Sequence, residues 1–290
     1  MQLDAILEVT IGLVLTWLVI SIGVMQVQEW IENRVSWRSH YLEQGIRGMF
    51  EDENMSRKFF NHPSIKALYR KSGRNKLPMN IPSERFAKVL MDVFVNAGKS
   101  ADEMPEGEWS LESMRSQLAS MQENNLQLAL KFGYLFKGID QKSADLDKKL
   151  SEWHTEIMNW FNDSMSIVSA EYRRNAQKWA FLIGIALAVA LNVDSIFIAQ
   201  ELWREPTLRA AIVAQAQAQA DAGIASFETI SRNLALPLGW NQDSLPKDIG
   251  GWAVKLLGFF LSGIAAAQGA PFWYDALRKL VSFKSHPESK

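Results

Sequence analysis

The feature that most constrains this chain is a run of 19 residues, Val9 to Val27, that contains no charged side chain. As a helix this run would rise about 28 Å at roughly 1.5 Å per residue, which matches the hydrocarbon thickness of a bilayer. A cleaved signal peptide is the alternative, but the start MQLDAILE is acidic and no small-residue cleavage site follows the run. The sequence therefore predicts a retained transmembrane helix within residues 1–28.

Two further apolar runs lie in the C-terminal half of the chain. One begins with 13 apolar residues, Trp179 to Leu191, is interrupted at Asn192-Val193-Asp194 and then resumes, so that only the extended segment 179–200 is long enough to span. The other, 252–273, contains Lys255, Gln268 and Pro271. A buried helix of a soluble protein is the alternative for both. Tryptophan favours membrane–water interfaces, and the expected anchors are Trp179, Trp203, Trp252 and Trp273.

The distribution of basic residues predicts an orientation. Residues 29–178 carry 22 Lys plus Arg, several of them close to the expected membrane ends, whereas residues 201–254 carry four against six acids. Positively charged flanks favour the cytoplasm. We therefore expect the N-terminus outside, residues 29–178 in the cytoplasm, residues 201–251 outside as a helical cap, and residues 274–290 as a basic cytoplasmic tail.

The second and third runs contain polar residues, and burying these residues in a membrane has a free-energy cost that other contacts must offset. If the two helices are antiparallel neighbours, Asp194 and Lys255 lie at similar depth, and a charge in the membrane is costly unless it is paired or reaches water. One hypothesis is an Asp194–Lys255 ion pair that joins the two helices, with the side chains within about 6 Å. The alternative is that both charges lie among the lipid headgroups. In an oligomer, Asn192 and Gln268 could join them along a polar path.

Several of the remaining segments have helical patterns. Residues 82–96 have helical apolar spacing and end at Gly98, and no Pro or Gly interrupts the chain from Ser143 to Trp179. We expect one long helix that bears a coiled-coil-like seam, continues into the second span and measures about 90 Å over some 60 residues. The predicted fold is an all-α membrane protein with three transmembrane helices and an α-helical cytoplasmic domain.

Motifs that would indicate chemistry are scarce. The chain contains no cysteine, and its four histidines have no metal-ligand spacing. Gly98-Lys99-Ser100 ends like a phosphate-binding loop, but Val93 stands where the first glycine belongs and the segment follows a helix. With a net charge of −1, nothing indicates nucleic-acid binding. We therefore predict no enzymatic activity, no metal and no cofactor.

Several segments together resemble a family of bacterial multi-pass inner-membrane proteins to which no activity is assigned. The segments that carry this resemblance are VTIGLVLTWLVISIGV, LEQGIRGMFED, HPSIKALYR, IPSERFAKVLMDVF, WFNDSMSIVSAEYRRNAQ, ALNVDSIFIAQELWREPTLRAAIVAQA and GAPFWYDALRKLV. It extends over nearly the whole chain and is weakest in residues 98–145. The resemblance implies a location in the bacterial inner membrane, three spans and the polar step at Asn192 and Asp194, and it implies no catalytic residue.

Three functions remain open at this point. The first is a non-enzymatic oligomeric scaffold or partner-docking anchor, whose partners are the lipid bilayer, further copies of the chain and a protein bound to the cytoplasmic helices. The second is a pore-forming or membrane-perturbing effector in a bacterial defence or stress system. The third, an enzyme with an unfamiliar cytoplasmic site, would require a concave pocket with converging polar groups.

Overall fold

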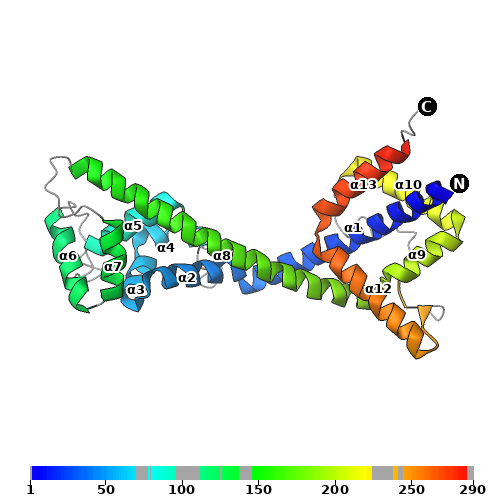
Figure 1. Cartoon of the computed structure of the whole chain (residues 1–290), viewed down its shortest axis with the longest axis horizontal. Coiled ribbons are helices and arrows are strands. Elements are labelled where there is room, and N and C mark those ends of the chain that lie inside the picture. Colours follow the sequence, from blue (N-terminus) through cyan, green and yellow to red (C-terminus); the bar gives the residue numbers. More distant parts are fainter. Residues whose placement is uncertain are drawn as a thin grey trace. The chain divides into compact units, whose positions relative to one another are not determined.

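The chain folds into helices, which Figure 1 shows in a computed structural model. The structure describes residues 2–69, 78, 80–95, 111–124, 126–136, 146–223, 238–240 and 244–285. Within these ranges no strand occurs, and the helices with described bounds are α-helices. They are α1 (Gln2–Val35), α2 (Trp37–Phe50), α3 (Glu53–Asn61), α4 (Pro63–Lys66), α5 (Ser83–Val95), α6 (Leu111–Asn124), α7 (Leu126–Leu135), α8 (Leu146–Ala190), α9 (Ser195–Arg204), α10 (Pro206–Ala222), α12 (Ile249–Ala267) and α13 (Ala270–Ser285).

The chain divides into two compact units. The helical body comprises residues 35–173, and the membrane unit comprises residues 1–34 and 174–290. By length and composition, α1 and α12 could each cross a membrane, and α8 with α9 would add a third span if that bent pair is counted as one. The expectation of an all-α membrane protein is thus confirmed at this level, with two or three candidate spans.

Aromatic side chains organise the core of the helical body. The rings of Phe86 and Phe161 stack with centroids 4.3 Å apart, and Phe86 also meets Phe59 at 5.1 Å. A second group forms around Phe94, whose ring lies 4.9 Å from that of Phe132. Offset and edge-on ring pairs of this kind stabilise a core beyond the area that they bury. They join α3, α5, α7 and the first part of α8.

The predicted long helix exists as α8, which has 45 residues, but it stops at Ala190. The chain bends by 51° before α9 begins at Ser195. The predicted span 179–200 is therefore two helices with a break between them. The physical reason lies in the sequence of the break, where Asn192 adopts a left-handed conformation with φ of 54° and Asp194 starts a new helix.

The predicted third span, 252–273, is also divided. Helix α12 ends at Ala267, Gly269 has a φ of 86°, and Trp273 belongs to α13. The indole ring of Trp273 lies 4.6 Å from that of Trp17. Because Trp17 is the ninth of the 19 residues in the run Val9–Val27, the start of α13 lies level with the middle of that run.

One carboxylate joins three segments at the other end of α13. Glu8 accepts hydrogen bonds from Lys284 Nζ at 2.7 Å and from Arg209 Nε at 2.8 Å. Since Glu8 immediately precedes the apolar run of α1, the side chains of Lys284 and Arg209 lie beside the start of that run. The helical part of the segment that was expected as a basic tail thus packs at the N-terminal end of α1.

Candidate functional site

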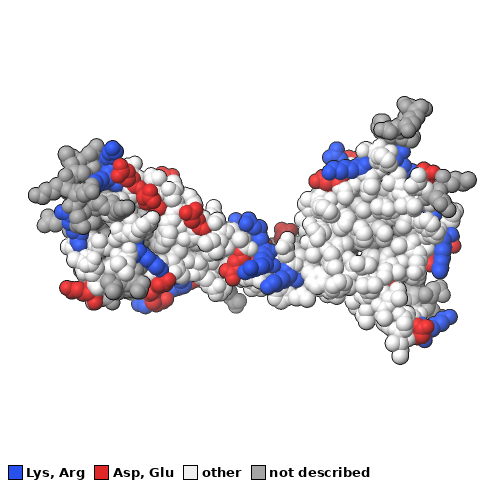
Figure 2. All heavy atoms as spheres, in the orientation of Figure 1, with Lys and Arg blue, Asp and Glu red and all other residues white. Residues whose placement is uncertain are grey.

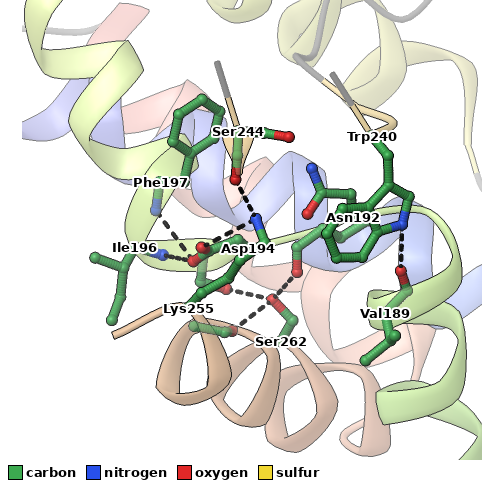
Figure 3. Close-up of polar contacts among 12 residues, drawn as sticks. Val189, Asn192, Asp194, Ile196, Phe197, Trp240, Ser244, Lys255 and Ser262 are labelled. Carbon is green, nitrogen blue, oxygen red and sulfur yellow. Dashed lines mark hydrogen bonds and ion pairs between the residues drawn. The ribbon is translucent and has the colours of Figure 1, made fainter. Parts of the chain in front are cut away.

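The candidate site is the buried polar cluster at the break between α8 and α9 (Figure 3). Asn192 turns the chain at this point, because its short amide side chain makes the left-handed conformation less costly than it is for most residues. The backbone N–H of Val193 then donates to the carbonyl of Ala188 at 2.7 Å. This bond satisfies one of the carbonyls that the end of a helix leaves without a partner.

A distant loop satisfies further carbonyls at the end of α8. The indole N–H of Trp240 donates to the carbonyl of Val189 at 2.9 Å, and the backbone N–H of Gly239 donates to the carbonyl of Leu191 at 2.9 Å. In return, Asn192 Nδ2 donates to the carbonyl of Gly239 at 2.8 Å. The loop and the end of α8 thus provide hydrogen-bond partners for each other, whereas lipid provides none.

Asp194 caps the start of α9. Its Oδ1 accepts the backbone N–H groups of Ile196 at 3.0 Å and of Phe197 at 3.1 Å. A carboxylate at this position satisfies two unpaired donors and is favoured by the positive end of the helix dipole. Asp194 therefore has a local structural role in addition to any partner on another helix.

The structure brings Lys255 of α12 to the same carboxylate. Its Nζ lies 3.9 Å from Asp194 Oδ2, and the two side chains are only 3% and 5% exposed. The ammonium also donates to the carbonyl of Ser244 at 3.0 Å and lies 5.0 Å from the ring centroid of Trp240. Lys255 thus contacts a carboxylate, a carbonyl and an aromatic face. Together these contacts offset the free-energy cost of removing the ammonium from water.

Gly258 makes this approach possible. A Cβ at that position would lie 1.7 Å from Asp194 Oδ1 and 2.5 Å from its Cγ. No side chain can occupy that space, so the carboxylate lies directly against the backbone of α12. The contact of Gly258 with Asp194 was not predicted from the sequence.

A chain of hydroxyl groups extends the cluster toward α1. The indole N–H of Trp17 donates to Ser195 Oγ at 3.0 Å, and Ser195 Oγ lies 2.7 Å from Ser262 Oγ. Ser262 donates in turn to the carbonyl of Val193 at 2.7 Å. These contacts connect α1, the break and α12 through one polar network, and such networks fix a single packing arrangement when their members are satisfied.

The remaining predicted residues lie elsewhere. Gln268 is exposed at the turn after α12 and lines an apolar cavity of about 960 Å³ together with Trp17, Gln200 and Trp273. Trp179, Trp203 and Trp252 are exposed, as interface anchors would be. Trp273 is half-buried, and its indole N–H donates to the carbonyl of Ala265 at 2.6 Å.

Sequence reasoning missed Ser195, Ser262, Trp240 and Ser244 as members of the cluster. Ser262 stands seven residues after Lys255, two helical turns along the same face, and this spacing was the available signal. Trp240 and Ser244 come from a loop whose position no periodicity reveals.

Within the described part of the chain, no three acidic or histidine side chains gather as metal ligands. His62 instead caps α4, where its Nδ1 accepts the backbone N–H of Ser64 at 3.2 Å. Burial lowers the pKa of its imidazole despite the nearby Asp92 carboxylate. The segment Gly98-Lys99-Ser100 lies outside the described residues.

No family model, no curated protein and no solved structure matches this chain.

Breaking the Asp194–Lys255 contact should destabilise the membrane unit. Asp194→Asn keeps an oxygen that can cap α9 but leaves the buried ammonium without a counter-charge, which costs about 3–5 kcal/mol. Adding Lys255→Met should recover most of that loss, as measured by reversible unfolding of the full chain in bicelles. Additive losses in the double variant, within about 0.5 kcal/mol, would show that the two side chains do not interact.

Gly258→Ala should destabilise the fold by about 3 kcal/mol or more, because the new methyl group must displace the Asp194 carboxylate. Gly250→Ala in the same helix is the matched control, since its Cβ would meet its nearest neighbour at an ordinary 3.6 Å. Thermal unfolding in detergent compares the two variants. Equal midpoints would show that the close approach at Gly258 is unimportant.

Proposed function

We propose that this chain is a non-enzymatic scaffold of the bacterial inner membrane that self-associates through its membrane unit and docks a partner on its helical body. The observation that supports it most is a polar helix face at the depth of the apolar run of α1. The inner-membrane location rests on the resemblance described above. We infer self-association from the depth of α10 and α13.

Contacts within the membrane unit support that depth. Helix α13 has Lys284 bonded to Glu8 at one end and Trp273 against Trp17 at the other. It therefore runs beside the first half of the apolar run, over about 14 Å of α1 at roughly 1.5 Å per residue. Helix α10 takes the same course, because Arg209 bonds to Glu8 and the Ala220 carbonyl accepts the hydroxyl of Tyr274 at 3.1 Å.

Exposed polar side chains lie along this stretch. On α13 they are Asp275, Arg278 and Lys279, and on α10 Gln217. Figure 2 shows charged side chains along α13, whereas the surface over α12 is largely uncharged. The exposed residues of α12 include Leu256, Leu257, Phe260, Leu261 and Ile264, which suit lipid. A charged face at this depth needs water or a protein neighbour, and a second copy of the chain supplies one.

The topology that we propose follows from the same contacts. Arg34, Arg38, Arg173 and Arg174 still favour a cytoplasmic helical body and an outer N-terminus. The Glu8–Lys284 ion pair supports an outer location for the end of α13 as well. In this arrangement α12 and α13 form a re-entrant pair whose turn lies inside the membrane, and α1 and α8–α9 are the two complete spans.

The helical body offers a surface for a partner. Leu130 and Tyr134 of α7 and Ile167 of α8 are strongly exposed for apolar side chains. A groove of about 510 Å³ between α7 and α8 is lined by Leu130, Tyr134 and the acids Glu156 and Asp163, with Lys131 at its side. Its chemistry suits a partner segment that combines apolar and basic side chains.

A pore is the second candidate, and the charges along α13 favour it. If several copies of the chain arrange their α13 faces around a common axis, Arg278 and Lys279 would face water along that axis. Asp194 and Lys255 would not line such a path, because they pair with each other inside one chain. In the pore that we consider, α13 forms the lining in place of the predicted residues Asn192, Asp194, Lys255 and Gln268.

Labelling from one side of the membrane tests the topology. The chain has no cysteine, so single cysteines at Leu3 and at Ser285 can be probed with a membrane-impermeant maleimide in intact spheroplasts. We expect both to react, whereas a cysteine at Ser151 of the helical body should react only after permeabilisation. Protection of the Ser285→Cys variant under conditions that label Leu3→Cys would place the termini on opposite sides.

The mass of the particle in lipid nanodiscs tests self-association. We expect more than one copy per particle, and fewer copies for Asp275→Lys, which leaves the α13 face with positive charges alone. Glu152→Lys, which changes another exposed acid, on α8, is the matched control and should leave the copy number unchanged. A single copy at every protein-to-lipid ratio would refute the scaffold proposal.

Ion flux in liposomes then separates the two candidates. An assembly that conducts no ions supports the scaffold. Flux that is lost in Arg278→Leu/Lys279→Leu while the copy number is unchanged supports a pore lined by α13.

A further inference from the structure

The helical body contains a second hollow whose lining differs from that of the docking groove. It measures about 530 Å³ and lies between α2, the start of α5 and α8. Its lining includes Arg38 and Arg173 and no acidic residue among the described side chains. All of the lining residues belong to the helical body, so the hollow is complete within that unit.

The positive charges of the two arginines can interact with a bound ligand. Neither guanidinium forms an ion pair with an acid of the described residues. Arg47 of the same unit shows the contrast, since it binds Glu43 at 2.8 Å and Glu53 at 2.9 Å. Two arginines that share one hollow without a carboxylate form an anion-attracting surface, and guanidinium matches the geometry of phosphate oxygens particularly well.

The rest of the lining divides into donors and an apolar floor. Asn80, Ser83, Asn162 and Ser169 offer amide and hydroxyl groups, while Leu42, Ile81, Phe161 and Met165 supply apolar surface. A small inorganic anion would use only the polar part. A ligand that carries a phosphate on an apolar body would use both parts.

One residue that lines the hollow, Arg173, is close in sequence to a candidate membrane span. Arg173 precedes Trp179, the first residue of the second apolar run, by six residues. Six residues reach at most about 20 Å even when fully extended. Whatever the arrangement of the two units, Arg173 therefore remains within reach of the headgroup layer if that run enters the membrane.

We propose that this hollow is a phosphate-binding site, in which Arg38 and Arg173 hold the phosphate and the apolar floor receives the adjoining part of a membrane lipid. A cytoplasmic headgroup site of this kind would couple the helical body to the anionic lipid content of the inner leaflet. The proposal stands independently of self-association, because every residue that it uses belongs to one chain.

Native mass spectrometry of the full-length chain in detergent tests the proposal, with phosphatidylglycerol as one probe and inorganic phosphate as the other. We expect Arg38→Gln/Arg173→Gln to weaken phosphatidylglycerol binding about tenfold or more. Arg38→Lys/Arg173→Lys should retain part of it, because lysine keeps the charge but not the planar donor pair. The matched control is Arg57→Gln/Arg85→Gln, which removes the same charge from exposed sites outside the hollow.

Each probe gives a distinct answer. Lipid binding that depends on the two arginines, with weak or no binding of inorganic phosphate, supports a headgroup site. Arginine-dependent binding of both probes supports a site that recognises the phosphate group and not the rest of the lipid. If both glutamine variants bind the lipid equally well, the hollow does not hold the phosphate and the proposal fails.

Discussion

The membrane unit depends on one constraint, which is that a helix broken inside an apolar layer must find partners for its freed backbone groups. The break between α8 and α9 meets this constraint from two sides. Trp240 and Gly239 supply donors to the end of α8, and Asp194 accepts two N–H groups at the start of α9. Each unsatisfied group would otherwise cost several kcal/mol where no water is present.

The course of α12 and α13 follows from this break. Asp194 carries a charge that needs a counter-charge, and Lys255 supplies it only because Gly258 lets the carboxylate reach the backbone of α12. Ser262 then ties α12 to the break through the carbonyl of Val193. Once α12 is fixed, the turn at Gly269 brings α13 along α1 and so carries Lys284 to Glu8.

The sequence predicted what depends on composition and local spacing. The charge-free run of α1, the long helix α8 and the shared neighbourhood of Asp194 and Lys255 could all be read from residue types and intervals. The end of α12 at Ala267 and the return of α13 could not, because apolar content alone does not distinguish a complete span from a helix that turns back. Nor could the sequence reveal the ion pair between Lys284 and Glu8, since it joins residues 276 positions apart.

The membrane unit contains two kinds of charge, and the difference between them indicates where its interactions with other molecules lie. Asp194 and Lys255 are buried and satisfied within one chain, so they contribute to the fold and leave nothing to recruit a neighbour. Asp275, Arg278 and Lys279 are exposed beside an apolar stretch of α1, where lipid would be a poor solvent for them. Any arrangement that keeps the exposed apolar residues of α12 in lipid must give the α13 face another environment. A second copy of the chain or an enclosed body of water would provide that environment, and assembly is therefore the step that the proposed scaffold and the proposed pore share.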